Sequence, residues 1–137
     1  MNIHDALREL LKILDDQTFI VHTRCLDEMK KLLQKDLKGK EEKFFELLIA
    51  QLKNIHDFGI MVYTVDHNER LKGGNGKFYS IHISQSQFNI RLIIHVGNSG
   101  KAYLLSTFYE RAGKKESDYT RILSVVESRL NELMEDS

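Results

Sequence analysis

Residues 69 to 115 read ERLKGGNGKFYSIHISQSQFNIRLIIHVGNSGKAYLLSTFYERAGKK, and this stretch decides the fold. Three runs rich in β-branched and aromatic residues, over 77–84, 88–96 and 102–109, predict three strands. The links between them, around 84–87 and 97–100, consist of Ser, Gln, Gly and Asn, which favour turns. Links this short force neighbouring strands to be antiparallel, because a parallel crossover needs about a dozen residues or more. The stretch therefore predicts an antiparallel meander.

The sequence on either side of the meander has mostly helical periodicity. Apolar residues recur at helical spacing over 3–14, 25–37, 41–56 and 119–133, and Ser117 is placed to cap the last of these helices. Residues 18–22, TFIVH, predict one short strand, whereas 57–68 are ambiguous, with 60–65 as either a short strand or a packed loop. The expected class is α+β: a small antiparallel sheet, made of the meander and the short N-terminal strand, packed by a helical hairpin and a C-terminal helix.

Charge is segregated along a chain whose formal net charge is zero. Residues 67–115 hold eight Lys or Arg and two Glu, a net of +6, while 1–66 sum to −2 and 116–137 to −4. A sheet that concentrates positive charge suits a phosphate backbone or an acidic partner.

Composition narrows the class of protein. With 137 residues, 42 % hydrophobic and 29 % charged, the chain fits one globular domain over 1–137, with 1–16 as a helical extension. One cysteine, Cys25, excludes an internal disulfide and favours the cytoplasm. The chain has no apolar run of about 18 residues, so no membrane partner is expected. We expect no metal and no cofactor: the histidines lack ligand spacing, and Gly76-Lys77 is followed by Phe78, unlike a phosphate-binding P-loop.

Strand alternation separates two faces of the meander. The aliphatic sets, Tyr79 to Ile83 and Ile90 to Val96 taken alternately, should meet the helices. The remaining set should form a polar face that holds Ser80, His82, Arg91 and His95. The faces of the third strand depend on its register, which the pattern leaves open.

The polar face carries groups that bind and cleave a phosphodiester: cations, a titratable imidazole and nearby aromatics. Each has a plain structural alternative. Arg91 fits a salt bridge, His82 a hydrogen-bonded structural histidine, and His95 the end of a strand. Lys72 and Lys77 flank a Gly-rich stretch that reads best as a flexible turn, in which the lysines attract RNA.

An ordered set of motifs resembles the RelE/ParE superfamily of bacterial toxins, and most closely its HigB-like and phage-derived branch. The set is the Leu71-Lys72-Gly73 turn, the tyrosine-containing strand at 78–83, the arginine strand around Arg91, and a third strand at 104–108 with basic residues after it. A capped helix then ends the pattern. The likeness covers about 18–134 and leaves the N-terminal helix as an addition.

The resemblance implies the toxin of a type II toxin–antitoxin pair, a ribosome-dependent mRNA endoribonuclease that needs no metal. It implies a cognate antitoxin and mRNA on the ribosome as partners. By position, the candidate catalytic residues are Arg91, Arg111, Tyr119 and, as base or acid, His82; the candidate phosphate contacts are Lys72, Lys77, Lys114, Lys115 and Tyr109. Tyr109 and Tyr119 fit the core equally well.

The chain departs from the pattern at Ser80 and His82, where the best-known branch has lysines. Two alternatives share the fold: a ParE-like poison of DNA gyrase, and a catalytically inactive module that binds RNA or protein. A homodimer is also compatible, since the apolar face of the N-terminal helix can serve self-association, antitoxin docking or the core.

Overall fold

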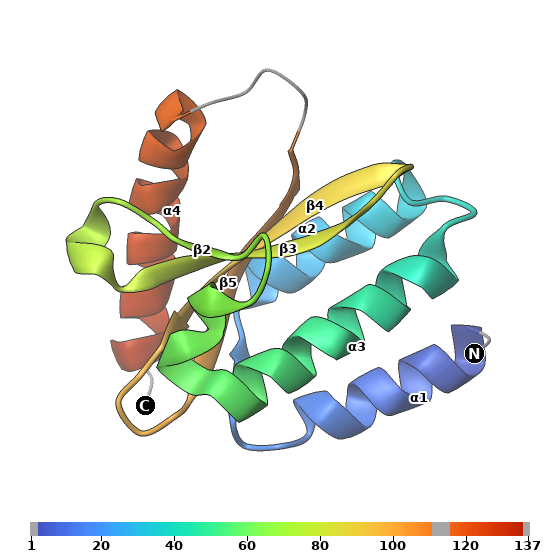
Figure 1. The fold of residues 1–137 in the computed structure, drawn as a ribbon, viewed down its shortest axis with the longest axis horizontal. Coiled ribbons are helices and arrows are strands. Elements are labelled where there is room, and N and C mark those ends of the chain that lie inside the picture. Colours follow the sequence, from blue (N-terminus) through green and yellow to red (C-terminus); the bar gives the residue numbers. More distant parts are fainter. Residues whose placement is uncertain (1–2, 111–115, 136–137) are drawn as a thin grey trace.

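The computed structural model describes residues 3–110 and 116–135. This part of the chain forms four α-helices, five strands and two short 3-10 helices (Figure 1). In chain order they are α1 (Ile3–Leu14), β1 (Phe19–Val21), α2 (Thr23–Gln34), α3 (Glu41–Phe58), η1 (Gly59–Thr64), β2 (Glu69–Arg70), η2 (Gly74–Gly76), β3 (Phe78–Gln85), β4 (Phe88–Val96), β5 (Ala102–Tyr109) and α4 (Glu116–Glu135). The α+β class and the three strands of the meander are confirmed.

The sheet is larger than expected and mixed. Its order is β1-β5-β4-β3-β2, with β3, β4 and β5 antiparallel and β1 parallel to β5. The prediction of an antiparallel sheet with four strands was therefore wrong at both edges. The chain leaves β1 through two helices before it returns to the sheet, and such long connections permit parallel pairing. The fifth strand, β2, has two residues, too few for any periodicity to reveal it.

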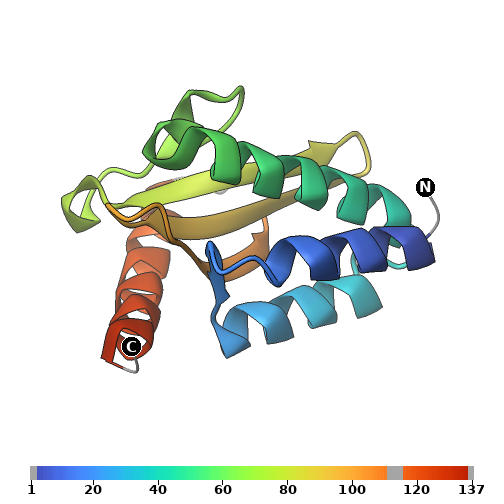
Figure 2. The same ribbon diagram turned by 90° about the horizontal axis from the view of Figure 1, so that it is seen from below.

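Two apolar layers enclose the sheet. One face of β3–β5, the core face, packs against α1, α2 and α3 through a large cluster that includes Ile81, Ile90 and Leu92. Phe44 is fully buried in it, a burial that contributes about 1.5–3 kcal/mol. On the opposite face, the polar face, α4 covers one end, where Val126 and Leu130 join a smaller cluster (Figures 1 and 2). The predicted division of the strands into two faces is confirmed.

The N-terminal helix belongs to the main core. Leu10 is buried there, and α1 packs against α3 along the same face of the sheet (Figure 2). The two helices of the expected hairpin thus have other main neighbours: α3 lies on α1 and the sheet, and α2 lies on β5. The extension at 1–16 completes the core instead of standing apart from it.

A β-bulge sets the faces of β5. Ile93 lies opposite Ser106 and Ile94 opposite Leu104, which leaves Leu105 as an extra residue. Leu104 is buried among the core-face residues and Leu105 under α4. Because of this shift, Phe108 lies on the polar face, opposite Arg91.

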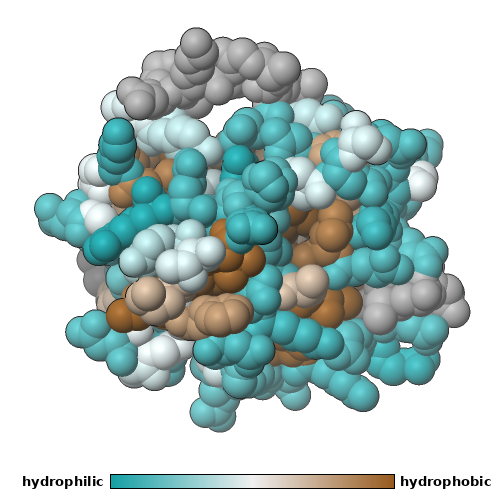
Figure 3. Space-filling view, in the orientation of Figure 1, coloured by the Kyte–Doolittle hydropathy of each residue, from teal (hydrophilic) through white to brown (hydrophobic). Residues whose placement is uncertain are grey.

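The segment 60–65 was expected as a short strand or a packed loop, and most of it forms η1 instead. Residues 57 and 58 complete α3, and the irregular residues 65–68 lead into β2 at Glu69. Phe58, Ile60 and Met61 are exposed, and apolar surface gathers over this region at the lower left of Figure 3.

The last helix begins at Glu116, one residue before the Ser117 that was expected to cap it; the capping side chain lies outside the described residues. In the described part of the chain, no helix combines the length and the apolar character that a bilayer crossing requires.

Candidate active site

Five side chains meet on the polar face near the start of α4. They come from distant points of the chain, and we call them the Arg91 cluster: His67, His82, Arg91, Glu110 and Tyr119. His82 and Arg91 share one face, as the alternation of both strands predicted, and they lie directly opposite each other on β3 and β4. Cross-strand neighbours of this kind have Cβ atoms about 4.5–5.5 Å apart.

The guanidinium of Arg91 is held on two sides. Its Nε donates to Glu110 Oε2 at 3.0 Å, and its Nη1 donates to the backbone carbonyl of His67 at 2.9 Å. The side chains of Arg91 and Glu110 are 13 % and 24 % exposed, so the pair is partly screened from water. A phosphate at this position must therefore compete with Glu110 for the guanidinium.

The backbone of His82 is fixed by two buried amides. Strand β2 pairs only with Tyr79 and Ser80, so it ends before it reaches His82. Asn68 Oδ1 accepts from the His82 N–H at 2.8 Å, and Gln51 Nε2 donates to the His82 carbonyl at 2.7 Å. Gln51 and Asn68 also bond to each other at 3.1 and 3.2 Å, which ties His82 to α3.

The surroundings of His82 favour the neutral form of its imidazole. Burial lowers its pKa, and the neighbouring Arg91 and His67 lower it further, against a smaller opposing effect of Glu110. The Ser84 hydroxyl lies 3.3 Å from His82 Nδ1. A neutral imidazole at pH 7 is able to accept a proton, which is what a general base requires.

His67 is a member of the cluster that the sequence did not reveal. Its ring centroid lies 4.9 Å from that of His82, and its side chain is exposed. Its φ of 69° lies in the left-handed region, which costs a non-glycine residue about 1 kcal/mol or more. Arg91 holds this conformation through the His67 carbonyl. Backbone strain beside a titratable pair is typical of functional sites.

Glu110 and Tyr119 close the cluster. The Tyr119 hydroxyl donates to Glu110 Oε2 at 2.9 Å, on the same oxygen that receives Arg91 Nε. Burial raises the pKa of Tyr119 to about 12; Glu110 raises it too, while Ser80 and Arg91 lower it. Tyr119 is therefore a neutral donor at any physiological pH. The buried Ser80 Oγ faces it without reaching hydrogen-bond geometry to any described residue.

The sequence did not predict Glu110 as a residue of the cluster, because a glutamate at the end of a strand is common. One signal was available. Glu110 and Glu69 are the two acids in the otherwise basic stretch 67–115, and Glu110 follows the strand that faces Arg91.

Among the described residues, the remaining candidates have other surroundings than the cluster. Lys77 pairs with Glu127 of α4 at 2.6 Å and lies over the ring of Phe78. Lys72 is exposed, after β2. Tyr109 lies on the core face and packs against the main core. Arg111, Lys114 and Lys115 lie outside the described residues.

His95 has the structural role that the sequence left open. Its Nδ1 lies 2.8 Å from the Lys77 carbonyl, and its ring stacks on Tyr103. Cys25 is fully buried, and burial raises its pKa to about 12, so its thiol is not an activated nucleophile. Among the described residues, no group of three or more His, Cys, Asp or Glu is placed to hold a metal ion.

Comparisons with protein-family models, with curated proteins and with solved structures found no match for this chain. The expected relation to the RelE/ParE toxins therefore depends on the motifs in the sequence.

Proposed function

We propose that the chain is the toxin of a type II toxin–antitoxin pair that cleaves mRNA on the ribosome, with the Arg91 cluster as its active site. The observation that carries the proposal is the meeting of two imidazoles, a guanidinium, a carboxylate and a phenol from five separate positions of the chain. This set holds a base, an acid and fixed donors, which are the groups that phosphodiester cleavage by an internal hydroxyl requires.

The two histidines divide the proton transfers. Neutral His82 takes the proton from the ribose 2′-hydroxyl, and the freed oxygen attacks the adjacent phosphorus. The bond from phosphorus to the 5′-oxygen then breaks, and that oxygen takes a proton from the protonated form of His67, the exposed member of the pair. The products are a 2′,3′-cyclic phosphate and a free 5′-hydroxyl, and the enzyme is left with the proton on His82 instead of His67.

Arg91 and Tyr119 stabilise the charge that develops on phosphorus. A guanidinium and a phenol fixed before the reaction lower the barrier without reorganising during it. Glu110 orients both, because one of its oxygens receives the Arg91 Nε and the Tyr119 hydroxyl. When a phosphate displaces this carboxylate from the guanidinium, the same donors point toward the phosphoryl oxygens.

Lysines outside the cluster supply attraction for the RNA backbone. Lys72 is exposed beside the sheet, and Lys77 lies at its edge against α4. Arg111, Lys114 and Lys115 follow Glu110 directly in the chain and add three positive charges there. Contacts with phosphates weaken as salt rises, so binding to ribosome or mRNA should fall steeply with ionic strength. The antitoxin we expect is acidic where it covers this segment.

One observation favours a second function, the inactive binding module of the same fold. Arg91 already has a carboxylate and a carbonyl as partners, as a structural ion pair would. In that case the polar face binds RNA or protein and performs no chemistry.

The deciding experiment is expression of the chain from a repressible promoter, with growth and mRNA integrity followed in the same cells. We expect growth arrest and mRNA cleavage with the wild type, and neither with Arg91→Ala or His82→Ala. Arrest with intact mRNA and cleaved DNA would favour the gyrase poison instead. Wild-type chain that accumulates in folded form without arrest would favour the binding module.

Matched controls use the same residue types on the helical side of the molecule. Arg24 and His4 are exposed on α2 and α1, so Arg24→Ala and His4→Ala should leave arrest and cleavage unchanged. Cleavage that survives both Arg91→Ala and His82→Ala would overturn the assignment of the site.

A further inference from the structure

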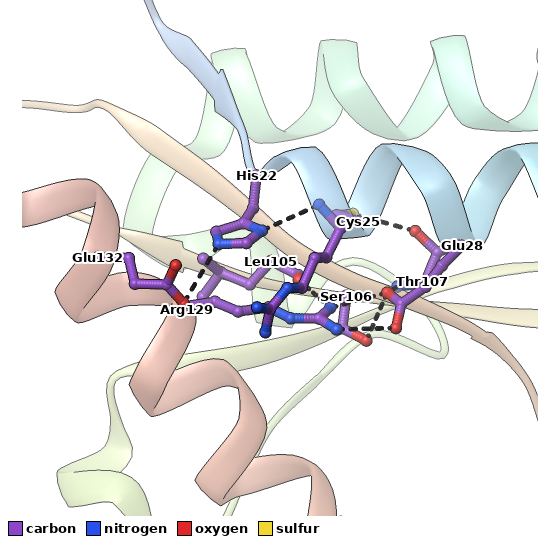
Figure 4. A network of polar contacts seen from close by, with 9 residues as sticks. His22, Cys25, Glu28, Leu105, Ser106, Thr107, Arg129 and Glu132 are labelled. Carbon is purple, nitrogen blue, oxygen red and sulfur yellow. Dashed lines mark hydrogen bonds and ion pairs between the residues drawn. The ribbon is translucent and has the colours of Figure 1, made fainter. Parts of the chain in front are cut away.

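A second polar network lies on the other side of β5, where α2 and α4 approach each other (Figure 4). Arg129 of α4 donates to both carboxylate oxygens of Glu28, at 2.8 and 3.1 Å, and to the Leu105 carbonyl at 2.8 Å. Glu28 Oε1 also accepts from the Ser106 hydroxyl and the Thr107 N–H, both at 3.1 Å. One ion pair thus joins α2, β5 and α4.

The network provides hydrogen-bond partners for backbone groups of β5 that have no neighbouring strand to bond to. Strand β1 pairs with β5 only from Ala102 to Leu104, so the edge of β5 beyond that point has no strand partner. The Glu28–Arg129 pair takes up the Leu105 carbonyl and the Thr107 N–H on either side of the bulge. It therefore fixes both the bulge and the helix that packs over it.

Burying this ion pair costs desolvation free energy, so stability alone does not explain its presence. Arg129 is 8 % exposed, and its Nε is buried without a hydrogen-bond partner in the described part of the chain. Buried ion pairs are often matched or exceeded in stability by apolar residues of similar volume, and their best-attested role is to select one register among several. The apolar contacts of α4 are few: Val126 and Leu130 are buried, whereas Ile122, Leu123 and Leu133 are partly buried.

We propose that Arg129, with Glu28, is a positioning residue for the active site: it selects the register of α4 on the sheet and so keeps the Tyr119 hydroxyl on Glu110. The two residues of that contact sit on the two elements that the pair joins, Tyr119 on α4 and Glu110 just after β5. A slip of α4 by one turn moves it about 5.4 Å, far more than a hydrogen bond of 2.9 Å tolerates.

The test follows Tyr119 itself and needs no RNA. The inference rests on the proposed function only in treating Tyr119 as a residue of the active site. NMR of the full chain with carbon-13 at the tyrosine ζ position, assigned with Tyr119→Phe, reports the titration of the Tyr119 phenol. Burial and Glu110 place its pKa at about 12 in the native chain, with Arg91 and Ser80 as its other polar neighbours.

The main variant replaces the pair by apolar residues of similar size, Glu28→Leu/Arg129→Met, so that no charge is left buried alone. We expect a folded chain in which Tyr119 titrates about 1–2 pH units lower, toward the ordinary value of about 10, because a shifted α4 takes the phenol out of its buried position and away from Glu110. Arg129→Lys, which keeps the charge and loses the two-pronged contact, should give a smaller shift. This single variant decides the question if the double variant fails to fold.

The matched control breaks a different ion pair of α4, Lys77–Glu127, by Glu127→Gln. Tyr119 should titrate there as in the wild type. An unchanged Tyr119 titration in the folded pair variants, or an equal shift in the control, would overturn the inference. Neither result depends on RNA cleavage. The proposal of nuclease activity and the proposal of a positioning role for Arg129 can therefore be rejected independently of each other.

Discussion

One arginine–glutamate pair lies on the polar face and another at the edge of β5 between α2 and α4, and they differ in what surrounds them. Arg129 meets Glu28 through two nitrogens, and its remaining bond goes to a backbone carbonyl. Arg91 meets Glu110 through one nitrogen, beside two imidazoles and a phenol that donates to the same carboxylate oxygen. The Glu28–Arg129 pair therefore bonds to the backbone of β5, whereas the Arg91–Glu110 pair adjoins side chains able to accept or donate protons.

The comparison shows why exposure alone is a poor guide to function. The arginine side chains are 9 % and 13 % exposed, and the glutamates 33 % and 24 %. What separates the pairs is chemistry: a histidine with a lowered pKa and a strained histidine adjoin Arg91. Substitutions in the two pairs should therefore affect different properties of the protein.

The largest effect should follow the loss of the Arg91 guanidinium. Arg91→Ala removes the cation that we propose stabilises the phosphorane, so cleavage should fall by about 100- to 1,000-fold. Quantified primer extension on mRNA in a purified translation system measures the rate, and thermal unfolding checks the fold. Arg24→Ala is the control for loss of one arginine. Full activity in a folded Arg91→Ala protein would remove Arg91 from the site.

The same change in the other pair should act on stability. Arg129→Ala leaves Glu28 without its partner and frees the Leu105 carbonyl, at a cost of about 2–3 kcal/mol. This figure lies below that for a fully buried pair because Glu28 is 33 % exposed. Urea unfolding measures the loss, which should exceed the loss in Arg91→Ala. The reverse order would mean that Arg91, not Arg129, is the structural arginine.

A smaller effect should follow the loss of the amide that holds His82. Asn68→Ala leaves the His82 N–H without its acceptor and removes both bonds between Asn68 and Gln51, at a cost of about 1–2 kcal/mol. Cleavage should fall as well, because the base is no longer fixed. Asn54→Ala is a matched control, since that amide bonds to Gln51 and does not reach His82. Equal losses in the two variants would contradict the positioning of His82 by Asn68.

The smallest effect is a change in how stability depends on pH. His82 has a lowered pKa in the folded chain, whereas an unfolded histidine titrates near pH 6.5. Just below that pH the unfolded state binds more protons than the folded state. The contribution of His82 to the free energy of unfolding is therefore complete above about pH 6.5 and is lost as the pH falls through the folded pKa. Unfolding measured from pH 7 to pH 5 should show a shallower decline in His82→Asn than in the wild type or in His4→Asn. An identical slope in all three would show that His82 titrates normally.

The sequence predicted the parts of the site that depend on alternation. His82 and Arg91 were expected on one face because both strands have period 2, and they are cross-strand neighbours. The sequence did not predict the register between strands, because the alternation within one strand does not show which residues of the neighbouring strand lie opposite. The bulge at Leu105 brings Phe108 to the polar face beside Tyr119, and no local signal marks it.

The missed residues of the cluster share a cause. His67 lies in the irregular segment between η1 and β2, and Glu110 lies just beyond the last paired residue of β5. Neither position has a periodic pattern, so tertiary contacts set its place. His67 is bonded to Arg91, and Glu110 is bonded to Arg91, Tyr119 and Asn89. Tyr109 shows the converse, since a residue next to the site in sequence lies on the other face.

The end groups of the cleaved RNA test the central claim most directly. Cleavage by the Arg91 cluster makes the 2′-hydroxyl the nucleophile, so mRNA from a purified translation system should carry 2′,3′-cyclic phosphate and 5′-hydroxyl ends. These ends should be absent with His82→Ala and present with His4→Ala. Products with 3′-hydroxyl and 5′-phosphate ends, or intact mRNA with folded wild-type protein, would contradict the account.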